Sequence, residues 1–549
     1  MSQSSEDNIS KLILSYLNAL YGSEGPEVFE RLKEILPKSP VEGTRRTPDE
    51  KDVLLISYPG QIRTSASENE KPLVVLNKFY SEFLTGVFAG THLLPFYPST
   101  SDGGFAVSAY KQVDPDVGDW SDIRDFSGDL MFDAIFNHTS SQHPWFQGFL
   151  RGEEEFTNFY HSFDERPEMG SEKDHELSFV TRPRDTALLQ EFDTSSGDKK
   201  FVWATFGPDQ LDLNFQNPEV LLHCITVLIY YVTNGMTYVR IDAVPFLWKE
   251  LGTNCMSHPK THTLVKLFRS VLDWIAPQVQ LITESNVPHE ENISYFGDHK
   301  DEAQLVYNFS LAPLILYGIT EGSTKYLKNW ISGLDFTSRT TTYFNFTSTH
   351  DGIGMRPLEG VLTDEEIDAF VEKMESKKGL VSYRTLGHVK RPYELNITWA
   401  SAMAEEDEDL HVQKILCSYA LCFAFPGVPG VYFHNLVGTL NDYAGYERTQ
   451  HRRDINRKEF DDLELRKLIS EEGFHKTVFD STLELLRLRK ESPVFQPFSK
   501  FKLLDSPDGI LGFTRTHDLL TGRFYFNLTS TPQSYNGVEL KPYGFYWEI

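Results

Sequence analysis

Short, continuous hydrophobic runs recur along the chain, and each ends in polar or turn-forming residues. They are VLLISY from Val53, THLLPFY from Thr91, LMFDAIFNH from Leu130, TYVRIDA from Thr237, VQLITES from Val279, LVYNFS from Leu305, TYFNFTSTHD from Thr342 and VPGVYFHN from Val428. Continuous rather than alternating hydrophobicity is typical of strands that are covered on both faces, as in parallel sheets. These runs therefore predict eight buried strands.

Helical patterns separate several of the predicted strands. The clearest begins at Asn217-Pro218, a capping residue followed by a proline suited to the first helical turn, and continues to Gly235, which favours a helix stop. Strands that alternate with helices predict an α/β fold of the (β/α)8 TIM-barrel type. In that fold the reactive side chains lie at the C-terminal ends of the strands.

Some segments do not fit this alternation and indicate additional domains. Two amphipathic helical patterns and a linker rich in proline and charge precede the first strand, two connections are too long for a simple crossover, and the last segments are short and β-rich. We expect an N-terminal helical extension at 1–50, a barrel in three parts at 51–138, 215–351 and 411–497, inserted subdomains over the barrel mouth at 139–214 and 352–410, and a small antiparallel C-terminal β domain at 498–549.

Composition and charge narrow the set of partners. The 549 residues include 79 acidic and 52 basic side chains, a net charge of −27 that disfavours nucleic acid and anionic membranes as partners. The first residues, MSQSSEDNISK, lack the features of a secretion signal, and no apolar run approaches the roughly 18 residues of a membrane span, so we expect a cytoplasmic protein. Four cysteines without C-x-x-C spacing disfavour a zinc site or a disulfide framework.

Polar side chains gather at the predicted C-terminal ends of strands three, four, five and seven. They are Asp133, Asn137 and His138, then Arg240 and Asp242, then Glu284, and finally His350 and Asp351. Each one alone has an ordinary structural explanation, such as a helix cap or a buried ion pair. Because a barrel brings these strand ends to one opening, their combination predicts an active site.

The segments around these residues resemble a known enzyme family. DAIFNH, GMTYVRIDAV, LITES and FTSTHD resemble, in order and spacing, the four signature regions of the α-amylase family of retaining glycosidases. The resemblance implies that Asp242 is the nucleophile, Glu284 the general acid/base, and Asp351 the carboxylate that binds sugar hydroxyls and stabilises the transition state. It also implies that His138 and His350 bond the glucosyl ring.

The spacing of Arg240 and Asp242 fits these roles. Side chains two residues apart on a strand share one face, so the guanidinium favours the charged form that a nucleophilic carboxylate needs. Glu284 must instead keep a proton, which requires a raised pKa. A retaining mechanism places the two carboxyl groups about 5–5.5 Å apart. The alternative is a merely structural ion pair between Arg240 and Asp242.

Beyond residue 50 the chain is most similar to the sucrose phosphorylase branch of this family. The matching segments are THLLPFYPSTSDGGF, FVWATFGPDQLDLN and RRDINR. The resemblance implies that Asp102 and Arg453 clamp the far hydroxyls of glucose and close the pocket behind a single sugar. It also places Phe105 and Phe206 beside the sugar ring and Gln210 near the leaving group. Core packing is the alternative for the two aromatic residues.

A phosphorylase needs local cations because phosphate must enter a strongly acidic protein. TRPRD at 181–185 resembles an arginine-bearing loop of this branch, so Arg182 and Arg184 are candidate phosphate ligands, with solvated loop charges as the alternative. Arg391 and Tyr393, in RPYELN, are weaker acceptor-site candidates. Lys260 and His262 are candidates for an anionic leaving group, unless they simply begin the helix THTLVKLFRSVLDWI.

The helical extension, GTNCMSHPKTHTLVK and LITESNVPHEENISYFG most resemble the glucosylglycerate phosphorylases. The resemblance implies reversible phosphorolysis of 2-O-α-D-glucosyl-D-glycerate to α-D-glucose 1-phosphate and D-glycerate. Phosphate would be a co-substrate, with no cofactor and no metal. Pro245-Phe246 stand where the branch commonly has a glycine and an aromatic residue, which leaves the acceptor open.

Several alternatives remain. They are phosphorolysis of sucrose, sucrose 6'-phosphate or glucosylglycerol, and hydrolysis or transglucosylation by the same carboxylates. A non-catalytic interaction protein is disfavoured because all three carboxylates are present. The sequence leaves both a monomer and a homo-oligomer open.

Overall fold

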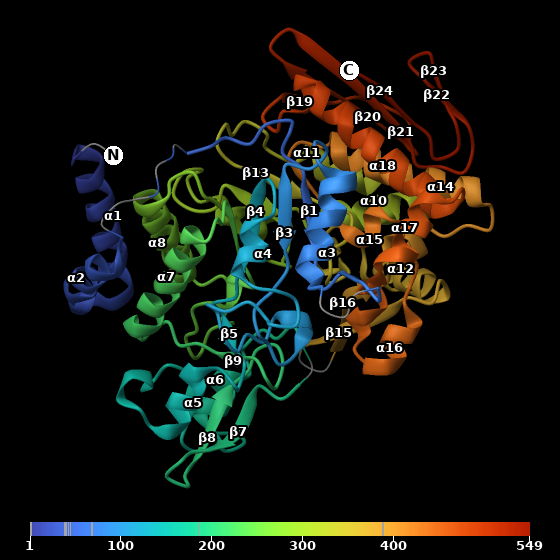
Figure 1. Ribbon diagram of the computed structural model, residues 1–549. Coiled ribbons are helices and arrows are strands. Elements are labelled where there is room, and N and C mark those ends of the chain that lie inside the picture. Colours follow the sequence, from blue (N-terminus) through green and yellow to red (C-terminus); the bar gives the residue numbers. More distant parts are fainter. Residues whose placement is uncertain are drawn as a thin grey trace.

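A closed parallel barrel forms the centre of the molecule (Figure 1). The computed structural model describes the chain except for residues 1–2, 38–40, 42, 44, 67–69, 185 and 387–388, so parts of the predicted linker and Asp185 of TRPRD lie outside it. Its strands are β1 (Leu54–Ser57), β3 (Gly90–Leu93), β4 (Asp129–Ala134), β10 (Tyr238–Ile241), β11 (Gln280–Thr283), β12 (Leu305–Tyr307), β13 (Thr342–Asn345) and β17 (Val428–Tyr432). They are the eight strands predicted from the hydrophobic runs, and the barrel is confirmed.

The pairing register of the strands determines which side chains lie next to one another inside the barrel. β10 pairs with β4 and β11 so that Arg240 lies opposite Asp133 on one side and Ile282 on the other. Arg240 and Asp133 are both buried. A cation and a carboxylate are therefore neighbours inside the barrel, just below the end of β10.

Helices surround the barrel on the outside. They include α3 (Pro72–Phe79), α7 (Pro218–Thr233), α8 (Pro259–Ile275), α10 (Leu311–Glu321), α14 (Glu408–Ala424) and α18 (Phe474–Glu491). The predicted cap of α7 is confirmed, since the Asn217 side chain accepts a hydrogen bond from the backbone N–H of Glu219. The helix ends at Thr233, and Gly235 follows with a φ of 96°.

The N-terminal helices pack against this outer layer. α1 (Gln3–Tyr21) lies along α8, and α2 (Gly25–Ile35) is close to α7 (Figure 1). Tyr21 donates a hydrogen bond to the carbonyl of Phe215 at 3.1 Å, and Arg31 forms an ion pair with Glu219. Leu17 is completely buried, so the extension shares the main hydrophobic core.

Two inserted segments lie at the barrel mouth. The first holds α5 (Pro144–Arg151), α6 (Glu172–Leu177) and a sheet of β6 (Ser162–Phe163), β8 (Lys199–Trp203) and β7 (Leu189–Asp193). The second holds α12 (Asp364–Ser376) and a sheet of β14 (Ile353–Gly354), β16 (Val389–Asn396) and β15 (Leu380–Leu386). Because α14 begins at Glu408, the barrel resumes slightly before the predicted boundary at residue 410.

The C-terminal part of the chain forms an antiparallel sheet, as predicted. Its order is β19 (Lys500–Leu503), β20 (Ile510–His517), β21 (Leu520–Asn527) and β24 (Phe545–Glu548). It lies against α14, which contains the buried, free Cys417 and Cys422. Within the described residues, no helix combines the length and apolar character needed to cross a membrane.

Candidate active site

A narrow cavity of about 50 Å³ lies at the C-terminal ends of the barrel strands. It is lined by many of the residues predicted from the sequence: Asp102, Phe105, His138, Arg184, Phe206, Gln210, Asp242, Glu284, Asp351, Tyr393 and Arg453. Ala243, Asn286, Phe309, Gly352, Gly354 and Glu394 complete the lining. Residues from both inserted segments and from the segments after seven barrel strands thus meet around one space.

Arg240 lies beneath this cavity and contacts three carboxylates. It forms an ion pair with Asp133, donates a hydrogen bond from Nη1 to Oδ1 of Asp242 at 2.9 Å, and places Nη2 3.8 Å from Oε2 of Glu284. Asp133 also bonds His92, at 2.8 Å. The guanidinium therefore brings Asp242 and Glu284 together, with Asp242 in the closer contact.

The backbone after Asp242 also positions Glu284. Ala243 has a φ of 48°, in the left-handed region that a residue with a Cβ rarely adopts. In this conformation its N–H donates a hydrogen bond to Oε2 of Glu284 at 2.9 Å. A strained turn at the end of β10 thus fixes one carboxyl group relative to the other.

Burial and neighbouring charges shift the pKa values of both carboxyl groups. Burial raises the pKa of Asp242 well above its ordinary value and also raises the pKa of Glu284, while Arg240 opposes both shifts. Because both groups are buried and the charge of Glu284 also raises the pKa of Asp242, the pair retains a proton more readily than exposed carboxyl groups do. The closer contact of Arg240 with Asp242 favours the proton on Glu284.

Arg453 closes one side of the cavity by joining three other carboxylates. Its Nη1 lies 2.7 Å from Oδ1 of Asp351 and 3.5 Å from Oδ1 of Asp102, and its Nη2 donates to Oε2 of Glu394 at 3.2 Å. Although burial raises the pKa of Asp351, Arg453 and the other nearby cations lower it overall. Asp351 is therefore ionised, whereas the pair around Arg240 retains a proton.

Aromatic and amide side chains form the wall next to Asp102. Nε2 of His138 lies 3.0 Å from the carbonyl of Phe105, and the Phe105 ring stacks on His350 with centroids 4.9 Å apart. Burial lowers the pKa of His350 to about 3, so its ring is neutral. Gln210 donates to Asp102 at 3.2 Å and lies 3.1 Å from Nε2 of His138. Its amide thus contacts the Asp102 side of the cavity, and its place near the leaving group stays a prediction.

Phe206 and Arg182 belong to the first inserted segment and differ in their placement. The Phe206 ring contacts His138, with centroids 5.4 Å apart, and lines the cavity. Arg182 donates to the Thr186 hydroxyl at 3.3 Å and is not part of the lining, whereas Arg184 is. The loop thus presents one of its two arginines to the cavity.

Lys260 and His262 lie outside the cavity, which corrects their prediction as ligands of an anionic leaving group. The Lys260 ammonium group lies 4.4 Å from the centre of the Trp248 ring. His262 bonds Glu302 at 2.9 Å and stacks on Tyr295. Both belong to the first turns of α8, in agreement with the alternative that they begin this helix.

A β-bulge in β16 explains why Tyr393 lines the cavity and Arg391 does not. In β16, Glu394 pairs with Ser382 and Pro392 pairs with Tyr383, so Tyr393 is an extra residue without a partner on β15. Residues two apart on a regular strand share a face, but a bulge breaks this rule and re-aims side chains. Tyr393 and Glu394 therefore both line the cavity, while Arg391 pairs with Asp364 at 2.6 Å. The prediction for Arg391 is corrected for this reason.

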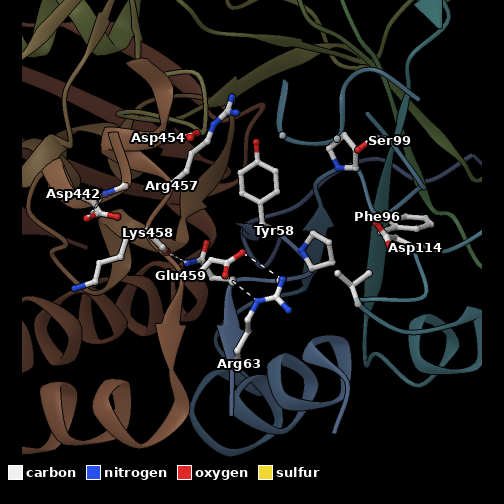
Figure 2. A pocket seen from close by; sticks show the side chains of 18 of the residues that line it. Tyr58, Arg63, Phe96, Ser99, Asp114, Asp442, Asp454, Arg457, Lys458 and Glu459 are labelled. Atoms are coloured by element: carbon white, nitrogen blue, oxygen red, sulfur yellow. Dashed lines mark hydrogen bonds and ion pairs between the residues drawn. The ribbon is translucent and has the colours of Figure 1, made fainter. Parts of the chain in front are cut away.

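A second cavity of about 280 Å³ is lined by Tyr58, Arg457 and Lys458 among others (Figure 2). Gly103 and Gly104, from the loop that carries Asp102, also line it, and the Arg457 guanidinium lies 5.6 Å from the Tyr58 ring centre. Arg457 is also 3.9 Å from Asp102, which lines the first cavity. The loop and Arg457 therefore separate the two cavities.

We expect the loop that separates the two cavities to require glycine at position 103. Its φ is 60°, and a Cβ would lie 2.5 Å from Nη1 of Arg457 and 3.0 Å from the Tyr58 hydroxyl. We expect Gly103→Ala to reduce kcat/KM at least tenfold, because the added methyl group displaces the loop that carries Asp102. Gly22→Ala is the matched control, with a φ of 61° and nothing within 4 Å of the added Cβ. Equal kcat/KM values for the two variants would contradict the expectation.

Sequence reasoning missed Glu394, Asn286 and Arg457. Glu394 and Asn286 lie in RPYELN and LITESNVPHE, two segments that resemble the family. Their place in these segments is the feature of the sequence that could have indicated them. The bulge that turns Glu394 inward depends on pairing with β15 and leaves no mark in the sequence of β16. Arg457 follows four residues after the predicted Arg453.

Comparisons with known proteins show which families this chain resembles. A family model described as the α-amylase catalytic domain matches residues 85–352. The glucosylglycerate phosphorylase of Allomeiothermus silvanus is 42% identical, with 98% of each chain covered, and that of Escherichia coli is 38% identical, with 90% of this chain and 87% of the other covered. The crystal structure of sucrose 6F-phosphate phosphorylase from Thermoanaerobacter thermosaccharolyticum has a TM-score of 0.76 at 24% identity, covering 89% of this chain and 98% of the other.

Proposed function

Because this chain belongs to the α-amylase family and, within it, to the family of the glucosylglycerate phosphorylases, we propose that it catalyses the reversible phosphorolysis of 2-O-α-D-glucosyl-D-glycerate. The products are α-D-glucose 1-phosphate and D-glycerate. The observation that carries the proposal is the contact of one buried guanidinium, Arg240, with both Asp242 and Glu284 at the cavity floor. That arrangement supplies a nucleophile and a proton donor to one reacting bond.

The reaction proceeds in two displacements. Asp242 attacks the anomeric carbon and forms an ester bond, while the bond to glycerate breaks and Glu284 gives its proton to the departing oxygen. Phosphate then attacks the same carbon, the ester bond to Asp242 breaks, and the ionised Glu284 accepts a proton from the phosphate. Two inversions give the α-configured product.

The Asp102 side of the cavity holds a single glucosyl unit. Asp102 and Asp351 accept hydrogen bonds from sugar hydroxyls, and Arg453, which lies between them, fixes both carboxylates. Phe105 and His138 form the adjoining wall. Because this side is closed by charged groups that pair with one another, the donor contributes one sugar and its leaving group lies toward Glu284.

Arg184 is the candidate phosphate ligand. It lines the cavity and lies 5.6 Å from the centre of the Tyr393 ring. A charge-assisted hydrogen bond contributes about 1.5–3 kcal/mol, so we expect Arg184→Ala to raise the KM for phosphate about 10- to 100-fold. Phosphorolysis should suffer more than hydrolysis of the same donor. Arg166→Ala is the control, since Arg166 lies over the Phe201 ring and outside the lining.

We propose that phosphate is the sole additional reactant and that no metal or other cofactor takes part. The carboxyl pair supplies nucleophile and acid, and in the described part of the chain no group of three or more His, Cys, Asp or Glu side chains is arranged to hold a metal ion. Activity that is lost with a chelator and restored by calcium would contradict this. The four free, buried cysteines fit the reducing cytoplasm, which we propose as the location.

Product analysis tests the proposed function. The purified protein is incubated with α-D-glucose 1-phosphate and D-glycerate, glycerol, fructose or fructose 6-phosphate, and released phosphate is measured. The proposal expects the fastest release with D-glycerate and little without an acceptor. Faster release with a sugar acceptor would favour a sucrose phosphorylase-type activity. Acceptor-independent release of glucose would favour hydrolysis.

A further inference from the structure

Arg356 is a buried cation without an anionic partner. It begins the short helical turn Arg356–Leu358 after β14, and it is 7% exposed. Its Nη1 donates to the carbonyl of Asn286 at 3.2 Å and lies 3.6 Å from the sulfur of Met256, while its Nε has no partner. No carboxylate among the described residues forms an ion pair with it.

Other buried arginines of this chain have carboxylate partners or several carbonyl acceptors, although the Nε atoms of Arg240 and Arg515 also have no partner. Arg240 and Arg453 contact carboxylates. Arg489 and Arg515 have no carboxylate partner, but each donates to at least three backbone carbonyl groups. Burying a charged group is costly unless it is paired or fully hydrogen-bonded. Arg356, with one carbonyl and one thioether, lacks the compensation that the others have.

The surroundings of Arg356 belong to the acceptor side of the cavity. Asn286, which accepts its hydrogen bond, lines the cavity two residues after Glu284, the proposed proton donor to the leaving group. Gly354, two residues before Arg356, also lines it. The positive charge of Arg356 acts on the hydroxyl of Tyr393, another lining residue. Arg356 thus contacts the lining residue Asn286 directly and lies in the segment that follows the lining residue Gly354.

The cavity must widen when substrate binds. A volume of about 50 Å³ is well below the roughly 300–1,000 Å³ of typical ligand sites, so a glucosyl unit with an acceptor displaces side chains of the lining. Met256 packs with Phe246 and Val287 in a small apolar cluster that Phe206 adjoins. The Asn286 carbonyl accepts from Nη1 of Arg356, so displacement of Asn286 would free this donor for whatever occupies the acceptor side.

We infer that Arg356 binds an oxyanion on the acceptor side of the cavity, either the carboxylate of the leaving group or the incoming phosphate. This inference rests on the proposed function. A guanidinium matches both anions because its donors form a planar fork that bonds two oxygen atoms at once. The anion supplies the counter-charge that the protein itself does not give to Arg356. An acceptor that carries a carboxylate is thereby distinguished from a neutral polyol.

Arg356→Met tests the inference, because methionine keeps a flexible apolar stem and removes the charge. If Arg356 holds the acceptor carboxylate, the KM for D-glycerate rises about 10- to 100-fold, while glycerol as acceptor and the KM for phosphate change less than twofold. If it holds phosphate, the KM for phosphate and for glucose 1-phosphate rise instead. Arg391→Met, which removes a half-buried arginine paired with Asp364, should change neither. A folded Arg356→Met protein with both KM values within twofold of wild type would overturn the inference.

Two further experiments apply if Arg356→Met does not fold or if no phosphorolysis is detected. They are the Arg356→Lys variant and a binding measurement. Lysine keeps the charge but not the fork, so this variant should recover part of the lost affinity even if the methionine variant does not fold. Thermal shifts with D-glycerate, phosphate or glycerol read binding without turnover. Wild-type protein that is stabilised by an anion, with the stabilisation lost in Arg356→Met and kept in Arg391→Met, supports the inference even if no phosphorolysis is detected. Equal shifts in all three proteins contradict it, whereas absence of turnover alone contradicts the proposed function.

Discussion

Replacing Asp242 with alanine is expected to lower kcat by on the order of 10⁴-fold or more, because no covalent intermediate can then form. Asp242 is the cavity-lining carboxylate that Arg240 contacts most closely, at 2.9 Å. Arg240 keeps its ion pair with Asp133 in the variant, so the barrel interior stays compensated and the fold is retained. The measurement is kcat with glucose 1-phosphate and D-glycerate, together with a thermal unfolding curve.

A trapping experiment identifies the nucleophile independently of rates. A 2-deoxy-2-fluoroglucosyl donor, followed by proteolysis and mass spectrometry, should label the peptide that contains Asp242 in the wild-type protein. Asp209→Ala is the control, because Asp209 bonds Thr100 and the Ser141 backbone near the cavity but is not part of its lining. That variant should keep the label and most of its activity. Wild-type activity in a folded Asp242→Ala protein, or a label on another residue, would remove Asp242 from this role.

The barrel and its catalytic floor could be predicted from the sequence because both follow from regular structure. A strand covered on two faces must be continuously hydrophobic, so β4, β10 and β11 are visible as apolar runs. Once such strands close into a barrel, their C-terminal ends meet whatever the loops do. Asp242 and Glu284 each follow the end of such a strand, and their convergence needs no further information.

Residues on the inserted loops could not be placed in the same way. Whether Arg391 or Glu394 faces the cavity depends on a bulge that forms only against β15. Lys260 and His262 were judged by charge, but the capping of α8 at His258 directs them to Trp248 and Glu302. Charge indicates what a side chain can bind, whereas its direction is set by packing between distant segments.

Glu284→Gln is expected to reduce kcat/KM for glucosylglycerate by about 10²- to 10⁴-fold, since glutamine cannot give a proton to the departing oxygen. Glutamine keeps the size of the side chain and an oxygen that accepts the Ala243 N–H. With α-glucosyl fluoride, whose leaving group needs little protonation, formation of the glucosyl-enzyme should be far less affected. The comparison of the two donors is the measurement, and equal losses would contradict the proposed role.

The pH profile gives the same role a second test. Burial raises the pKa of Glu284, with Arg240 opposing the shift, so the protonated form persists above the ordinary pKa of a glutamic acid. Activity that requires this proton is present below the raised pKa and is lost as the pH rises through it. The alkaline limb of kcat/KM should therefore disappear in Glu284→Gln.

Glu394→Gln is the matched control, because burial also raises the pKa of Glu394, but this group pairs with Arg453 on the sugar-clamping side. It should weaken substrate binding while leaving the alkaline limb in place, and loss of that limb in Glu394→Gln alone would transfer the proton-donating role to Glu394.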